Sequence, residues 1–150
     1  MKISEQINED MKSAMRAKDK VTLEALRAAK TAFTLARTQE GSTGELSNED
    51  ELKIIQKLVK QRNESAEIYK QQLRDDLYQN EIAEAKALEK YLPAKLSAEE
   101  LKASVRSIIE KTGASGMKDM GKIMGVASKE LAGKADGKEI ATIVKELLGA

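Results

Sequence analysis

The sequence predicts an all-α protein, with an N-terminal four-helix unit, a C-terminal three-helix unit and no sheet. Apolar residues recur at three- and four-residue steps through most of the 150 residues, which is the period of amphipathic helices. No segment sustains the period-two alternation of a half-buried strand. The only proline, Pro93, separates two self-contained helical patterns, so we expect domains at residues 1–93 and 94–150.

Four helices are expected before Pro93. Ser47 is a suitable N-cap because acidic residues fill the first turn that follows it. Pro93 should end the fourth helix, since the residue before a proline disfavours the helical conformation. Glycines and small polar residues predict a loop between the second and third helices. The expected helices cover residues 4–18, 20–39, 48 to about 73 and 74–92, with the loop at 41–47.

Three more helices are expected after Pro93. Ser97 and Glu100 have the spacing of a capping box, and Gly113 fits the C-terminal cap of the helix that they begin. Asp136 and Glu139 form a similar start for the last helix. The expected helices cover residues 97–112, about 118–131 and 136–148.

The composition excludes several function classes. With no histidine and no cysteine, the chain cannot build a common zinc site, a Ser-His-Asp triad or a disulfide, so we expect no metal and no cofactor. It has no apolar run of the roughly 20 residues that cross a membrane and no signal-peptide core, so we expect a cytoplasmic protein. Aromatic residues are only 3%, which argues against a base-stacking platform. At a net charge of +1, nucleic-acid binding would need a local basic patch.

The stretch GMKDMGKI matches the G-x-x-x-x-G-K spacing of a phosphate-binding P-loop through Gly116, Gly121 and Lys122. A P-loop follows a strand and continues with Ser or Thr, whereas a predicted helix precedes this stretch and Ile123 occupies the Ser/Thr position. We therefore expect no nucleotide.

Glycines four residues apart occur twice in this region, at Gly121 and Gly125 and at Gly133 and Gly137. A glycine inside a helix costs about 1 kcal/mol relative to alanine, so the first pair needs a reason. We favour close approach of a neighbouring helix. The alternative is exposed backbone that can meet a bulky ligand such as a phosphate-ribose backbone.

Several motifs resemble those of one known family. KLVKQRNESAEIYKQQLR at residues 57–74 and EIAEAKALEKYLP at 81–93 are followed by DMGKIMG at 119–125 and LAGKADGKEI at 131–140. In this order and spacing they resemble the YqeY family over essentially the whole chain. That family is related to the tail domain of GatB, the B subunit of the tRNA-dependent amidotransferase that makes Gln-tRNA or Asn-tRNA. A similar module is appended to a bacterial glutaminyl-tRNA synthetase.

The resemblance implies an all-helical, two-part fold and an association with tRNA, in which the tail helps to hold tRNA for an enzyme. The chain lacks the catalytic parts of the amidotransferase, namely the kinase-like GatB body and the amidase-type core. We therefore expect no catalysis by the chain on its own. The family's motif positions fall on Lys57, Lys60, Gln61, Arg62, Ser65, Arg74, Met120, Gly121, Lys122, Met124, Gly125, Gly133, Lys134, Ala135, Asp136, Gly137 and Lys138.

Basic residues outnumber acidic ones between Lys53 and Arg74, and the stretch from Asp75 to Lys90 on the next helix has the opposite balance. The two helices can pair their charges as neighbours, and we favour this interpretation for Arg62, which falls within the apolar stripe. Lys53, Lys57 and Lys60 share the opposite face and suit phosphate contacts. Together with Arg74 they are the N-terminal candidates for nucleic-acid binding.

The C-terminal candidates are Lys118, Lys122, Lys134 and Lys138, which surround the two glycine-rich turns. Lysines beside helix starts suit phosphate oxygens. An equally weighted alternative is that these lysines only keep a small domain soluble.

These observations favour a non-catalytic helical module whose partner is tRNA or a tRNA-modifying or aminoacylating enzyme. The first alternative is a protein–protein interaction module without RNA contact. The last is part of a carbon–nitrogen ligase with glutamine as amido donor, which the missing catalytic constellations disfavour.

Overall fold

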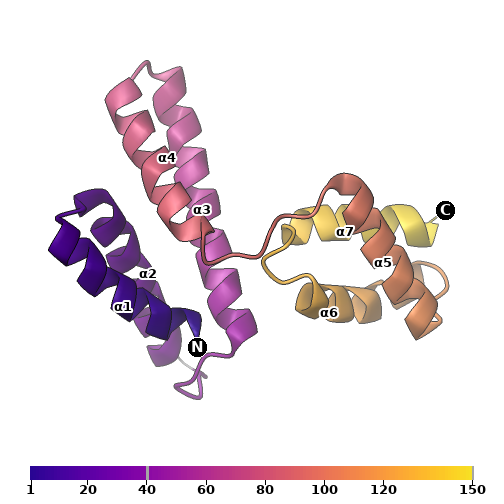
Figure 1. Cartoon of the computed structure of the whole chain (residues 1–150). Helices are drawn as coiled ribbons and strands as arrows, with labels where there is room; N and C mark the ends of the chain where they lie inside the picture. Colours follow the sequence, from indigo (N-terminus) through magenta and orange to yellow (C-terminus); the bar gives the residue numbers. More distant parts are fainter. Residues whose placement is uncertain (40, 150) are drawn as a thin grey trace. The chain divides into compact units, whose positions relative to one another are not determined.

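The structure is a computed structural model that describes residues 1–39 and 41–149 (Figure 1). Within these residues it contains seven α-helices, one short 3₁₀ helix and no strand. The predicted all-α fold class is therefore confirmed. The chain divides into two compact units, Met1–Leu92 and Pro93–Ala150. Whether each unit folds as an independent domain, as the sequence predicts, stays a prediction.

The N-terminal unit contains four helices, and its buried core joins all of them. Ile7 of α1, Phe33 of α2, Ile55 of α3 and Leu88 of α4 are all fully or almost fully buried. The longest pairing is the antiparallel hairpin of α3 and α4 (Figure 1). The helices are α1 (Ile3–Ala17), α2 (Lys20–Thr38), α3 (Asn48–Gln71) and α4 (Asp75–Glu89).

Hydrogen bonds link α1 to other segments of the N-terminal unit. Glu51 of α3 is completely buried, and its Oε1 accepts a hydrogen bond of 3.0 Å from the backbone N–H of Ser4, in the first turn of α1. The Tyr91 hydroxyl donates a hydrogen bond to Asp10 farther along α1. Because the first N–H groups of a helix have no partner within the helix, Glu51 acts as a cap supplied by another helix.

The C-terminal unit packs three helices around one apolar core. Val105 of α5, Ile123 of α6 and Val144 of α7 are fully or almost fully buried. Leu96 N–H donates to the Lys134 carbonyl at 3.0 Å, so the entering chain is tied to the turn before α7. The elements are α5 (Ala98–Thr112), the 3₁₀ helix η1 (Met117–Asp119), α6 (Met120–Glu130) and α7 (Gly137–Gly149).

Most predicted helix caps are present. Ser47 and Asp50 form a reciprocal capping box at α3, Gly113 ends α5 in the left-handed conformation with φ 69°, and the Asp136 carboxylate accepts from Lys138 N–H at the start of α7. The predicted box of Ser97 and Glu100 is only half formed. Ser97 accepts from Glu100 N–H, but the Glu100 carboxylate accepts from the Ser97 hydroxyl instead of from its backbone N–H.

Three predicted boundaries are wrong by a few residues. Helix α4 ends at Glu89, because the next N–H groups turn back to carbonyls three residues earlier before the chain meets Pro93. Helix α3 ends at Gln71, and Leu73 then adopts φ 58° in the tight turn to α4. The helix expected from residue 118 starts as η1, and its α-helical part begins at Met120.

A candidate nucleic-acid interface

The four C-terminal candidate lysines lie on η1, α6 and the turn that leads into α7. Lys118, Lys122 and Lys138 are exposed, and Lys134 is half-buried. Within the described residues, none of the four forms an ion pair with a carboxylate. Their charges are therefore available to an external anion.

The glycines of α6 lie on its solvent-facing side. Ile123 and Ala127 point into the core, whereas Gly121 and Gly125 are exposed. A Cβ atom built at either glycine would meet nothing within 4 Å. The expectation that these glycines admit a closely packed neighbouring helix is therefore wrong. The alternative, that the backbone at these two glycines is exposed to solvent, agrees with the structure.

Cations border this bare backbone. At about 100° per residue, Lys122 and Lys129 project from the same side of α6 as Gly121 and Gly125. Lys129 is exposed and has no ion pair within the described part of the chain. The sequence analysis missed Lys129, although its seven-residue spacing from Lys122 signals a shared face.

The remaining C-terminal motif residues serve mainly to shape the unit. Met120 and Met124 are half-buried against the apolar core. Gly133 adopts φ 77°, a left-handed conformation that favours glycine, and Ala135 is buried in the same turn. Gly137 begins α7 with open space around it.

Two N-terminal candidates already have carboxylate partners. Lys53 forms an ion pair of 2.7 Å with Glu49 on the same helix. Arg74 makes two hydrogen bonds to the Asp76 carboxylate, which hold the pKa of Asp76 below its usual value and raise that of Arg74. A phosphate at either site would have to compete with a resident carboxylate. Lys57 is exposed on α3, and Lys60 is exposed but also has an interaction within the protein.

Arg62 faces the neighbouring helix, as predicted. Its Nε lies 4.0 Å from Oε2 of Glu84 on α4, and the Arg62 side chain is 18% exposed. Burial raises the pKa of Glu84 despite the attraction of Arg62, and the charges of Glu81 and Glu24 add to the rise. Among the neighbouring motif residues, Gln61 is exposed and Ser65 half-buried. Arg62 therefore contributes to the α3–α4 contact instead of to an exposed basic surface.

Two other kinds of site find no support in the described residues. Within residues 1–39 and 41–149, no group of three or more acidic side chains is arranged to hold a metal ion. None of the helices in the same ranges is both long and apolar enough to cross a membrane.

The fold and the surface define a class of small, two-unit helical proteins in which exposed glycines and lysines gather on the C-terminal unit. The chain belongs to the YqeY family: the family described as Yqey-like protein matches residues 4–148. No curated protein matches the chain.

Proposed function

We propose that the chain is a non-catalytic module that binds tRNA, or assists a tRNA-linked enzyme, through its C-terminal unit. The observation that carries the proposal is the exposed backbone of Gly121 and Gly125, bordered by lysines without ion pairs. A phosphodiester backbone needs positive charge and benefits from close approach to a surface without side chains. The resemblance to the GatB tail domain supports tRNA as the form of RNA.

The glycines cost stability without a packing return, which supports a binding role. Each glycine inside a helix is about 1 kcal/mol less favourable than alanine, and alanine would fit at both positions. The two glycines therefore lower the stability of the unbound protein, and their benefit would come only when a ligand approaches the exposed backbone.

Two variants test the proposal by binding of unmodified tRNA at several salt concentrations. Gly121→Ala with Gly125→Ala should weaken binding while preserving the fold, because two methyl groups then separate backbone and ligand. Changing Lys118, Lys122, Lys134 and Lys138 to Gln should flatten the slope of log K against log salt by about 0.7–0.9 for each lost phosphate contact.

A far-UV circular dichroism spectrum separates binding from folding, since Gln retains a helix-compatible side chain. Unchanged tRNA affinity in both variants, with intact helicity, would contradict the proposed interface. Wild-type protein that binds no tRNA even at low salt would contradict the function itself.

A second candidate function, docking to another protein, is favoured by the tip of the α3–α4 hairpin. Leu73 is 90% exposed and Ile68 is 53% exposed. Leu73 also holds φ 58°, an unusual conformation for a bulky residue. Exposed apolar residues at a strained turn suit a salt-insensitive protein contact. Pull-downs from lysate with Leu73→Ser protein, with and without ribonuclease, distinguish this contact from an RNA-dependent one.

A further inference from the structure

A second group of cations without ion pairs lies at one end of the N-terminal unit. Arg16 and Lys18 close α1, Lys20 begins α2, and Lys90 follows the last residue of α4. All four are exposed. We call them the turn cluster. None of its members was a candidate from the sequence, and Lys90 comes from a segment far from residues 16–20.

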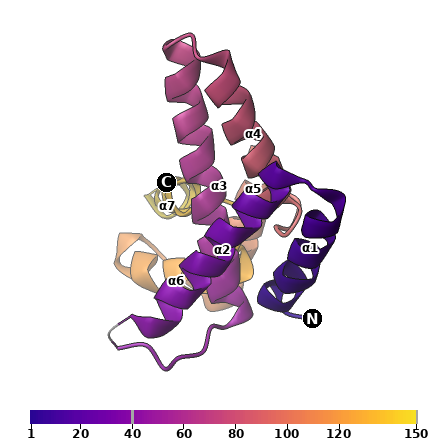
Figure 2. The same ribbon diagram turned by 90° about the vertical axis from the view of Figure 1, so that its left-hand side faces the viewer.

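Contacts between helices bring these segments together. Hydrogen bonds from Thr22 lower the pKa of Asp19, and the charge of Lys90 adds to this effect. Glu24, one turn farther along α2, adds to the effect of burial in raising the pKa of Glu84 on α4, so these two side chains also lie near each other. The start of α2 therefore lies near the end of α4, and the two helices are in contact. In the view of Figure 2 the start of α2 overlaps this end of α4.

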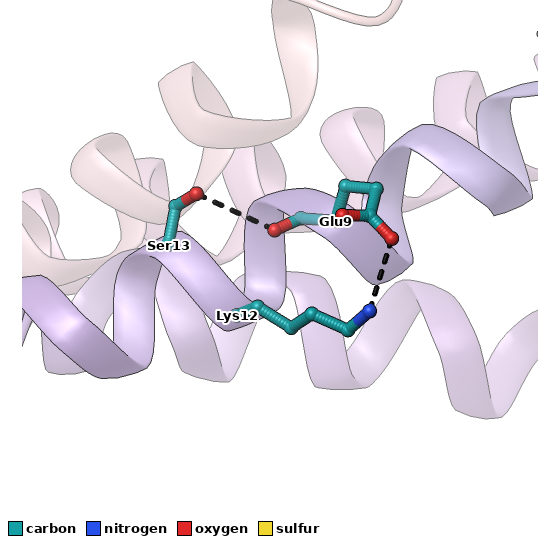
Figure 3. A network of polar contacts seen from close by, with 3 residues as sticks. All are labelled: Glu9, Lys12 and Ser13. Atoms are coloured by element: carbon teal, nitrogen blue, oxygen red, sulfur yellow. Dashed lines mark hydrogen bonds and ion pairs between the residues drawn. The ribbon is translucent and has the colours of Figure 1, made fainter.

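The turn cluster differs from the cations next to it. Lys12 pairs with Glu9 at 3.0 Å, as Figure 3 shows, and Arg27 pairs with Glu24 at 2.8 Å. The four cluster residues form no ion pair with any carboxylate of residues 1–39 and 41–149.

Carboxylates also lie near the turn cluster, and the Asp10 carboxylate accepts a hydrogen bond from Tyr91, the residue after Lys90. Asp19 accepts from Thr22 N–H as the N-cap of α2, and Glu89 precedes Lys90. The four cations outnumber these three carboxylates, and they leave a net positive surface.

The backbone at Lys18 is a second, independent observation. Lys18 caps α1 with φ 56°, in the left-handed region where helices usually end with glycine. A side chain at this position strains the backbone, and such strain concentrates at functional sites. Glycine would be easier to accommodate at this position. Lysine has a strained backbone here, and it supplies an ammonium group that glycine lacks.

We infer that the turn cluster is an additional binding surface for the phosphate backbone of structured RNA, in the N-terminal unit. The inference rests on the proposed function, because it takes the same partner class. Nucleic acid fits better than a membrane surface. The cations surround a turn and do not line one amphipathic helix, and Met15, at 53% exposed, is the large apolar residue that α1 exposes beside them.

Three variants with equal charge change test the inference by tRNA binding across salt concentrations. The test variant changes Arg16, Lys18, Lys20 and Lys90 to Gln, and the second is the C-terminal lysine variant described above. The control changes four paired cations, Lys12, Arg27, Lys95 and Lys102, to Gln. We expect the test variant to bind at least about tenfold more weakly than the control at low salt and to have a flatter salt slope.

The possible results separate the two proposals. A test variant that binds like the control, while the C-terminal variant is weakened, overturns the turn cluster and leaves the proposed function standing. Wild-type protein without tRNA binding overturns both. Binding to phosphatidylserine vesicles that the test variant loses, with tRNA binding unchanged, also overturns the inference.

Lys18→Gly separates charge from structure. Glycine relieves the left-handed strain, so the melting temperature should rise. The salt slope should fall by the equivalent of about one phosphate contact. A variant with unchanged tRNA affinity and salt slope would show that Lys18 makes no phosphate contact.

Discussion

The two units of this protein secure their helices by different chemistry. The N-terminal unit buries Glu51 and places Arg62 and Glu84 at a half-buried helix contact. In the described part of the C-terminal unit, every fully buried residue other than glycine is apolar, as at Val105, Ile123 and Val144. The difference follows from size, because a smaller unit buries a smaller fraction of its surface and has less apolar area to spare.

Polar contacts and apolar contacts also confer different properties. Glu51 can pair only where the N–H of Ser4 lies, so it specifies the position of α1 as well as its attachment. An apolar core supplies free energy with little directional preference. The comparison therefore predicts that core truncation matters most in the small unit, and that single polar changes matter most in the N-terminal unit.

The largest effect is expected from Ile123→Ala. Removing a buried isoleucine side chain costs about 2–5 kcal/mol, and a unit of this size has only a few kcal/mol of stability in total. We expect the C-terminal unit to unfold while the amides of α1–α4 keep their protection, measured by hydrogen exchange. Leu88→Ala is the matched change in the other unit. Loss of protection throughout the chain in Ile123→Ala would show that the units do not fold independently.

A smaller effect is expected from Glu51→Ala, which leaves the Ser4 N–H without a partner. The cost is about 1–3 kcal/mol, since the unpaired group stays partly shielded from water. Exchange of the first amides of α1 should accelerate more than that of α2. Glu51→Gln retains an acceptor and should cost less. Exposed Glu64→Ala is the control, and an equal loss of stability in this variant would argue against a specific role of Glu51.

Tyr91→Phe should cost about 1 kcal/mol at neutral pH and change the response to alkali. Burial, followed by the hydrogen bond to Asp10, raises the pKa of Tyr91. The folded state thus holds the proton more tightly than the unfolded state. This stabilisation is fully present below pH of about 10 and is lost as the pH rises further. Urea unfolding at pH 8 and pH 11 should show a smaller alkaline loss in Tyr91→Phe than in wild type, and equal losses would contradict this assignment.

The smallest effect is a gain. Gly121→Ala and Gly125→Ala should each stabilise the C-terminal unit by up to about 1 kcal/mol, because the added methyl meets open space. Gly113→Ala is the contrasting variant: it also has open space, but its φ of 69° makes alanine unfavourable. Thermal unfolding should show opposite signs for the two kinds of change. Destabilisation by Gly121→Ala would restore a packing role for that glycine.

The sequence by itself determined the helical fold and most of the helix starts. Ile7, Ile55 and Val105 lie on apolar stripes of helical period, and such periodicity reports which face of a helix is buried. Caps such as Ser47 and Gly113 were also predictable, because they depend on residues only a few positions apart.

Only the tertiary structure decided which polar residues form contacts between helices and which helix surfaces are exposed to solvent. Glu51 looked like one acid among several in the first turn of α3, and only the placement of α1 buries it. Gly121 and Gly125 were expected to face a helix and instead face solvent. Arg16, Lys20 and Lys90 became one cluster through the packing of α2 against α4. Sequence periodicity identifies the faces of a single helix, whereas these features depend on which helix comes to lie beside which, and that choice is made by contacts between residues far apart in the chain.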